Sequence, residues 1–298
     1  MKRSIFCLFM ALNFSLIISA PAHALDFGKI VDKAKVGITN ANVISSVDIG
    51  LQKIADSRYY FSRATAVDTK WVMLNVSKGE SKQQIIVPAI NGRASVNIYL
   101  RYGAGIYNIA FAESKFEGKY DGGYYVGQPV RIENIDFRDL NFLLPSDLVQ
   151  SDNEQIISLA KTLTMDAVNE LDAVKKIHKY VASNVKYDYA SYKDDSYKTK
   201  PFDAVSTLKS MTGVCAGYAN LYAALLRSVG IKTKVIYGIA YLTKTQTGEH
   251  AWNEILINNE WKSVDVTWDS TTGRMFKYFD MAEEVFDQDH QKQVVQDF

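Results

Sequence analysis

The order of apolar and polar residues divides this chain into a β-rich part and a later part with helices. Between residues 70 and 143, short apolar runs are separated by glycines, which is typical of strands joined by turns. One run alternates as a strand with a single buried face requires: Val96, Ile98, Leu100 and Tyr102. Five or six strands at this spacing predict a small β-sandwich over residues 70–144.

Helical spacing replaces this alternation from residue 145 onward. Ser151-x-x-Glu154 is a capping-box pattern, and it precedes the apolar residues of a first helix. Apolar residues three and four positions apart, from Val168 to Val181, predict a second helix. A third is expected from Cys215 to Val229 with Gly230 after its last turn, and strands are expected over 234–242 and 249–268. The chain is therefore predicted to be α+β, with residues 145–298 forming the larger domain.

The N-terminal residues have the pattern of an export signal. Lys2 and Arg3 precede a mostly apolar stretch that ends in Ala22-His23-Ala24, so residues 1–24 are expected to be a cleaved signal peptide. A retained membrane anchor is the alternative, although the apolar run is on the short side for a span. We therefore expect a secreted or periplasmic protein with no membrane span after cleavage. Residues 25–69 are weakly patterned, and Leu51, Ile54 and Ala55 hint at short helical pieces there.

Charge and cysteine content limit the possible functions. The chain has 34 basic and 33 acidic residues, so bulk charge recruits neither nucleic acid nor anionic lipid. It has two cysteines, and Cys7 lies in the predicted signal peptide, so Cys215 is left without a partner for an internal disulfide. A lone thiol is unusual in an exported protein, where cysteines are mostly paired. Cys215 is therefore expected to be either a buried small hydrophobe or a reactive group.

The position of Cys215 favours a reactive thiol. It stands at the start of the predicted third helix, where partial positive charge and unpaired N–H groups favour a thiolate and can hold an oxyanion. Gly213 and Gly217 flank it and allow close backbone approach, although ordinary turn and packing roles are the alternative.

A predicted hairpin brings a histidine and an aspartate together. Asn258-Asn259 suits a two-residue turn, because asparagine tolerates positive φ. If that turn forms, His250 and Asp265 lie on one face of the hairpin as diagonal neighbours, roughly 7–8 Å apart at the backbone. A three-residue loop would place them on opposite faces. With the two-residue turn, Cys215, His250 and Asp265 become a candidate nucleophile, base and orienting carboxylate.

Other polar residues are weaker candidates. His178, on a helix among lysines, and His290, near the C-terminus, are expected to be solvated surface histidines. Neither has metal-ligand spacing with Cys215, so we expect no metal and no cofactor. Glu254 and Asp269 compete with Asp265 for the orienting role, but Glu254 lies further along the strand and Asp269 is expected in a turn.

Several sequence blocks resemble the transglutaminase-like superfamily, in particular its bacterial secreted members. The blocks are Gly213-Val214-Cys215-Ala216-Gly217-Tyr218-Ala219, Leu225–Ile231, His250-Ala251-Trp252-Asn253-Glu254 and Trp261–Asp269. The resemblance covers roughly residues 150–290. It implies a papain-like fold, with Cys215 as nucleophile, His250 as general acid/base and Asp265 as the orienting carboxylate. The β-rich part is compatible with an accessory domain that some members carry.

The resemblance also implies attack on an amide of a protein or peptide substrate, through a thioester intermediate. An amine would then give crosslinking, and water would give deamidation or peptide hydrolysis. We expect the substrate groove to include Trp252, Tyr218, Gly217 and Tyr187. A non-catalytic binding module with this fold and a structural β protein with a buried cysteine are the alternatives. The sequence does not indicate the oligomeric state.

Overall fold

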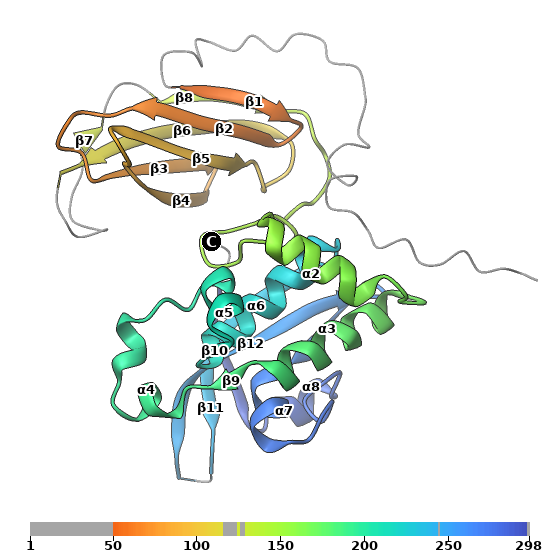
Figure 1. The fold of residues 1–298 in the computed structure, drawn as a ribbon. Helices are drawn as coiled ribbons and strands as arrows, with labels where there is room; N and C mark the ends of the chain where they lie inside the picture. The colour runs from red at the N-terminus through yellow and green to blue at the C-terminus, as the bar shows by residue number, and fades with distance from the viewer. Residues whose placement is uncertain (1–49, 116–123, 126–128, 244, 297–298) are drawn as a thin grey trace, which may run out of the picture.

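The computed structural model describes residues 50–115, 124–125, 129–243 and 245–296. The expected signal peptide and most of the weakly patterned segment after it lie outside these ranges. Within them, the chain is α+β, with an N-terminal sheet region followed by the larger helix-and-sheet domain (Figure 1). No helix in the described part of the chain is both long and apolar enough to cross a bilayer.

The N-terminal region is a sandwich of two antiparallel sheets. One sheet has the order β1-β2-β5, and in the other β4 pairs with β3 and β3 with β6, which also pairs with β7 and β8. Side chains from both sheets fill the space between them, as in the contact of Phe61 with Phe111, whose ring centroids lie 6.1 Å apart. The bounds are β1 Leu51–Ala55, β2 Arg58–Ala64, β3 Trp71–Lys78, β4 Ser81–Pro88, β5 Arg93–Tyr99, β6 Gly105–Ser114, β7 Tyr124–Tyr125 and β8 Val130–Asn134.

The sandwich begins earlier than its predicted boundary at residue 70. Leu51, Ile54 and Ala55 lie in strand β1, so the expected helical pieces at these positions are wrong. The residues of β1 and β2 become strand because they pair in register, Leu51 opposite Phe61, and both of these side chains enter the sandwich core. Burial against a facing sheet outweighs the weak local pattern.

The C-terminal domain packs helices against an antiparallel sheet of order β13-β12-β11-β14. Its helices and turns are α2 Glu154–Thr164, α3 Glu170–Asn184, α4 Tyr189–Lys193, η1 Ser196–Thr199, α5 Ala204–Ser210, α6 Cys215–Ser228, α7 Val266–Thr272 and α8 Glu283–Phe286. Its strands are β9 Lys186–Tyr187, β10 Thr212–Gly213, β11 Thr233–Tyr241, β12 Thr247–Ile257, β13 Glu260–Val264 and β14 His290–Gln296.

Helix α6 is the centre of this domain, and it is buried on nearly all sides from Gly217 to Ser228. Helices α2, α3, α5 and α7 and strands β11 and β12 all pack against it, so its N-terminus has a fixed position. Gly230, with φ of 88°, follows its last residues as predicted. The cap of α2 differs from the prediction, because Asn153 rather than Ser151 accepts the N–H groups of Gln155 and Ile156.

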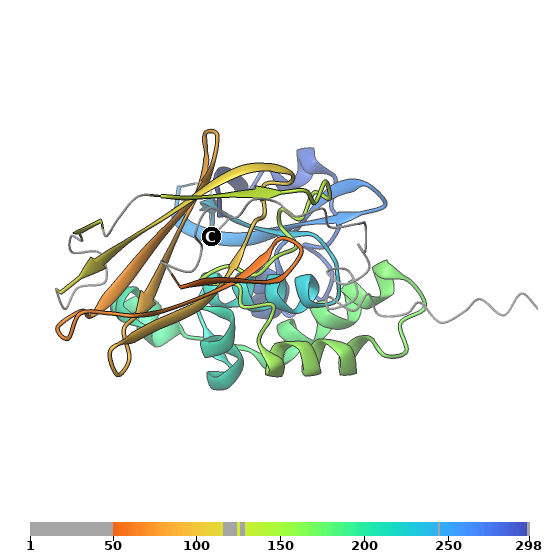
Figure 2. The same cartoon turned by 90° about the horizontal axis from the view of Figure 1, so that it is seen from above.

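The segment between the two domains is anchored on both sides. On the sandwich side, the buried guanidinium of Arg101 donates to the Pro145 carbonyl, and the Tyr99 hydroxyl lies 2.7 Å from Asp152 Oδ2. On the other side, Arg227 of α6 donates to the Leu144 carbonyl over 2.9 Å. The sandwich overlies part of the C-terminal domain, as the view from above shows (Figure 2).

Candidate functional site

Cys215 is the first residue of α6, as the sequence predicts, and its side chain is half-buried. The short parallel pair of β9 and β10 fixes the backbone just before it, with Tyr187 opposite Gly213 and the Asp188 N–H donating to the Gly213 carbonyl over 3.1 Å. No side chain caps the helix at Val214. The Gly217 N–H donates to the Val214 carbonyl over 2.9 Å, so the N–H groups of Cys215 and Ala216 are the ones at the helix start that no side chain of Val214 caps.

Gly217 and Tyr218, which follow the cysteine in α6, have packing roles. A Cβ at Gly217 would lie 2.8 Å from Thr207 Oγ1, so glycine here lets α5 approach α6. Tyr218 is fully buried, and its hydroxyl donates to the Val185 carbonyl over 2.5 Å. The expectation that Gly217 and Tyr218 line the substrate groove is therefore wrong, because both face the helix packing.

The hairpin register follows the prediction. Ile257 pairs with Glu260 across Asn258 and Asn259, whose φ angles are 51° and 68°. The second strand ends at Val264, however, and Asp265 becomes the N-cap of α7, so the strand predicted over 249–268 is too long. His250 lies beyond the last residue of β12 that pairs with β13, Asn253, and its ring reaches Asp265 there.

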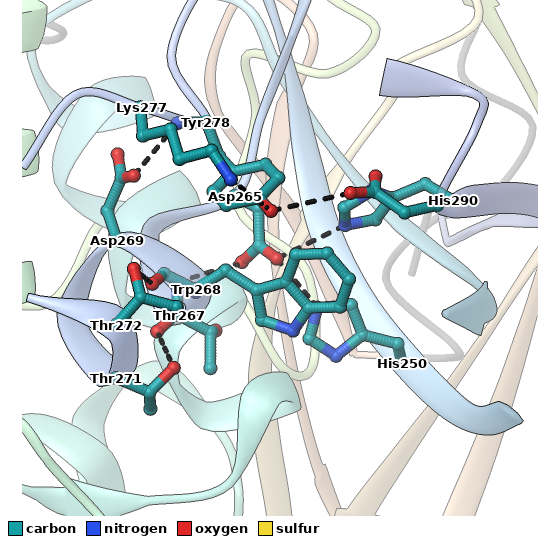
Figure 3. A network of polar contacts seen from close by, with 11 residues as sticks. His250, Asp265, Thr267, Trp268, Asp269, Thr271, Thr272, Lys277, Tyr278 and His290 are labelled. Carbon is teal, nitrogen blue, oxygen red and sulfur yellow. Dashed lines mark hydrogen bonds and ion pairs between the residues drawn. The ribbon is translucent and has the colours of Figure 1, made fainter. Parts of the chain in front are cut away.

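The Asp265 carboxylate is surrounded by hydrogen-bond donors. Oδ1 accepts the backbone N–H groups of Thr267 and Trp268 at 2.9 and 3.0 Å. Oδ2 lies 2.8 Å from His250 Nε2 and 3.2 Å from His290 Nε2, so the carboxylate stands between two imidazoles (Figure 3). Burial by itself raises the pKa of Asp265, but the charges and hydrogen bonds of His250 and His290 hold it well below its usual range.

His250 is buried, and it lies between the Asp265 carboxylate and the hollow that Cys215 lines. Burial lowers the pKa of His250, but the charge and hydrogen bond of Asp265 outweigh it, and the side chain of Cys215 adds a hydrogen bond and a further charge interaction. Together they raise the pKa of His250 to about 10. The His250 ring therefore has the Asp265 carboxylate at Nε2 and shares a hollow with the Cys215 side chain.

Two hollows open beside the thiol and the imidazole. The first has a volume of about 280 Å³, and Cys215, His250, Tyr237 and Phe202 are among the residues that line it. The second has a volume of about 220 Å³ and is lined by Tyr187, Tyr189 and Trp268 with His250. Tyr192, Glu249 and His250 line both, so the two hollows meet at the imidazole. Tyr187 lies beside His250 in the second hollow, and its place in a substrate groove stays a prediction.

Trp252 does not line either of these hollows. Only 2% of it is exposed, and its ring packs with Phe286 and His290 beneath the sheet. It also passes over Gly238, where a Cβ would lie 2.6 Å from the indole. The expectation that Trp252 walls the groove is wrong: Trp252 shares a face of β12 with His250, but its ring is enclosed in a cluster with Phe286 and His290.

Both histidines expected at the surface are buried. His178 has no exposed surface, and its Nε2 lies 2.8 Å from Asp269 Oδ2. Asp269 lies in α7 rather than in a turn, and its Oδ1 also accepts the Tyr278 N–H. His290 is 1% exposed and contacts Asp265 directly. The predictions failed because each histidine lies in a polar stretch, and Asp269 and Asp265, which bury them, come from distant parts of the chain.

Within the described residues, one group of possible metal ligands lies close together. The ligand atoms of His250, Asp265 and His290 lie within 4.8 Å of one another. All three side chains are buried, and Asp265 Oδ2 is hydrogen bonded to Nε2 of each histidine. We therefore assign the group to an internal hydrogen-bonded network. The expectation of no cofactor stays a prediction.

Comparison with known proteins identifies the class of this domain. Residues 157–266 match the family model of the transglutaminase-like superfamily. The chain therefore carries a transglutaminase-like core preceded by a sheet region, which confirms the resemblance inferred from the sequence blocks.

Individual relatives are similar over part of their length. Human kyphoscoliosis peptidase is 30% identical over 120 residues, which is 38% of this chain and 18% of that protein. UPF0252 protein MJ1282 of Methanocaldococcus jannaschii is 31% identical over 140 residues, 44% of this chain and 37% of that protein. The matches thus span well under half of these relatives. Among solved structures, red sea bream transglutaminase is 13% identical with a TM-score of 0.30, covering 70% of this chain and 47% of that chain.

Proposed function

We propose that this protein is an exported thiol enzyme that attacks protein or peptide amides through a thioester intermediate. One observation carries the proposal: Cys215 and His250 line the same hollow, and His250 Nε2 lies 2.8 Å from Asp265 Oδ2 on the other side of the ring. The transglutaminase-like core supports it. Export rests on the signal pattern of residues 1–24.

In this mechanism, the Cys215 thiolate adds to the carbonyl carbon of the amide, and the oxygen takes the negative charge. The free N–H groups at the start of α6 stabilise that oxyanion. The His250 imidazolium then gives its proton to the leaving amine as the C–N bond breaks, and the acyl group remains on sulfur as a thioester. Asp265 stays ionised throughout and holds His250 with Nδ1 directed at the thiol.

In the second half of the reaction, His250 acts as a base instead of an acid. His250 takes a proton from water or from a primary amine, the acceptor attacks the thioester, and the thiolate leaves. Water completes a hydrolysis or deamidation, and an amine completes a crosslink. Seven of the residues that line the two hollows are aromatic, which suits a side chain held by its apolar part while its amide reaches the sulfur.

The first test is the rate of Cys215 alkylation against pH, in a chain beginning at Leu25, where Cys215 is the only thiol. We expect fast alkylation with an apparent pKa well below the free-thiol value of about 8.5. His250→Ala is expected to slow alkylation near neutral pH and shift its pH profile. His178→Ala is the matched control, because it removes an imidazole at the same 2.8 Å from a buried aspartate.

A slow thiol whose alkylation ignores His250 would overturn the enzyme proposal and favour a binding module. If the thiol is reactive, mass spectrometry of a glutamine-containing peptide, with and without a fluorescent primary amine, separates the outcomes. Amine incorporation indicates transfer, conversion of glutamine to glutamate indicates deamidation, and shorter products indicate peptide hydrolysis. Cys215→Ala must abolish all three.

A further inference from the structure

A second histidine touches the aspartate of the proposed triad. His290 is the first residue of β14, and pairing of β14 with β11 places it opposite Ala240. Its Nε2 lies 3.2 Å from Asp265 Oδ2, and its Nδ1 lies 2.6 Å from Asp289 Oδ1. The imidazole therefore has a carboxylate oxygen at each of its two nitrogens.

This arrangement determines how many protons His290 carries. A neutral imidazole has one N–H, so its other nitrogen would present a lone pair to a carboxylate oxygen. Asp265 has no proton to offer, because its oxygens already accept the N–H groups of Thr267 and Trp268 and face His250. Two hydrogen bonds to two ionised carboxylates require His290 to donate from both nitrogens, as an imidazolium.

The surroundings of His290 suit a buried cation. The Phe286 ring stacks on the imidazole, with centroids 4.0 Å apart and planes at 21°, and the Trp268 centroid lies at 4.4 Å. Aromatic faces stabilise a cation placed over them and keep water away. The Tyr278 hydroxyl is 3.4 Å from Asp289 Oδ2 and accepts a hydrogen bond from Lys277. Trp268, Tyr278 and His290 gather around Asp265 (Figure 3).

Other charged groups near His290 lie around the hollow on its outer side. Glu254, Glu283, Asp287 and Lys292 line that hollow together with His290. Glu254 is paired with Lys234 at 2.7 Å and also with Lys292, so its charge is largely balanced. Asp265, Asp289 and His250 are thus the ionisable groups that face the His290 ring most directly.

We propose that His290, as an imidazolium, is a positioning residue of the thiol site that holds Asp265 in place and limits the proton affinity of His250. This inference rests on the proposed function. The His290 and His250 ring centroids are 5.6 Å apart, so a positive charge on one disfavours a positive charge on the other. Asp265 strengthens the proton affinity of His250, and His290 offsets part of that effect. His250 can then release its proton to the leaving amine and recover it in the second half of the reaction.

Two variants separate the charge of His290 from its hydrogen bond. His290→Gln keeps an N–H donor for Asp265 and removes the charge. Asp289→Asn keeps the imidazole and removes the carboxylate that holds its second proton. Because Asp289 is partly exposed, with 32% of its side chain accessible, this variant tests the proposal even if His290→Gln fails to fold.

The experiment is a pH titration of ring nitrogen chemical shifts in a ¹⁵N-histidine-labelled chain beginning at Leu25, with His290→Gln and His250→Gln used for assignment. We expect both His290 nitrogens to be protonated at neutral pH. The His250 titration is expected to move upward by about one to two pH units in His290→Gln and in Asp289→Asn. A merely structural His290 would lower thermal stability without moving the His250 titration.

One unprotonated His290 nitrogen at neutral pH would overturn the inference, as would a His250 titration that is unchanged in both variants. This readout needs no thiol chemistry, so it is independent of the test of the proposed function. An inert Cys215 together with a doubly protonated His290 would overturn the enzyme proposal and leave the charge network standing. A reactive Cys215 with a neutral His290 would overturn the inference about His290 and leave the enzyme proposal standing.

Discussion

Replacing Asp265 by asparagine perturbs the proposed site at its most connected group. The amide oxygen of the introduced side chain can still accept the N–H groups of Thr267 and Trp268, so the cap of α7 is kept. The amide NH₂ then faces the Nε2 atoms of His250 and His290, which lie 2.8 and 3.2 Å from the oxygen it replaces. The amide NH₂ donors would then face ring N–H donors. To accept a hydrogen bond from the amide, His250 must present a lone pair at Nε2 and carry its proton on Nδ1, toward the sulfur.

Two magnitudes follow from this geometry. With its proton on the thiol side, His250 cannot accept the thiol proton, and loss of the correct tautomer in a triad costs on the order of 10⁴ in rate. A buried donor left without an acceptor costs about 1–3 kcal/mol of unfolding free energy. Asp265→Asn is therefore expected to fold, with a modest loss of stability and a large loss of thiol reactivity.

The assay is the rate of Cys215 alkylation at neutral pH, combined with urea denaturation of the same sample. Asp265→Ala is the comparison, because it also removes the α7 cap and should cost about a further 1 kcal/mol. The two variants should then differ in stability and share the loss of reactivity. Wild-type alkylation in Asp265→Asn would refute the tautomer argument.

Three further predictions test other parts of the structure. His178→Leu leaves the buried Asp269 without its imidazole partner and should lower the unfolding free energy by about 3–5 kcal/mol, measured by urea denaturation, whereas alkylation per folded molecule should stay unchanged. Asn259→Val places a β-branched residue at a φ of 68° and should cost about 1–2 kcal/mol in the same assay, whereas Asn259→Gly should cost nothing. Because the pKa of His250 is raised in the folded protein, its contribution to stability should be fully present below about pH 6.5 and be lost as pH rises toward about 10. A flat stability profile from thermal melts across that range would contradict the assignment.

The hairpin and the thiol helix could be predicted from sequence because local rules determine them. Asn258-Asn259 specifies a two-residue turn, and that turn sets the register that brings His250 to Asp265. The position of Cys215 at a helix start follows from the apolar spacing after it. In both cases, a few consecutive residues contain the whole signal.

The buried positions of His178 and His290 could not be predicted because Asp269 and Asp265, which they contact, are distant in sequence. His178 meets Asp269 only when α3 packs on α7, and His290 meets Asp265 only when β14 pairs with β11. The β14 segment His290–Gln296 is mostly polar, so no alternation marks it as a strand. The prediction for Trp252 failed for a related reason. In the sequence, a tryptophan two residues from a histidine is equally consistent with a groove wall and with a buried core.

The pairing of β14 with β11 also has a consequence for the order in which the site is completed. Synthesis proceeds from the N-terminus, so Cys215, His250 and Asp265 all leave the ribosome before His290. A chain that has emerged only as far as α7 carries a thiol, an imidazole and a carboxylate, but Asp265 lacks one of its two imidazole neighbours. The last contact to Asp265 forms when the strand that begins at His290 joins the sheet, so the nascent chain reaches the far end of the domain before the network around its thiol is complete.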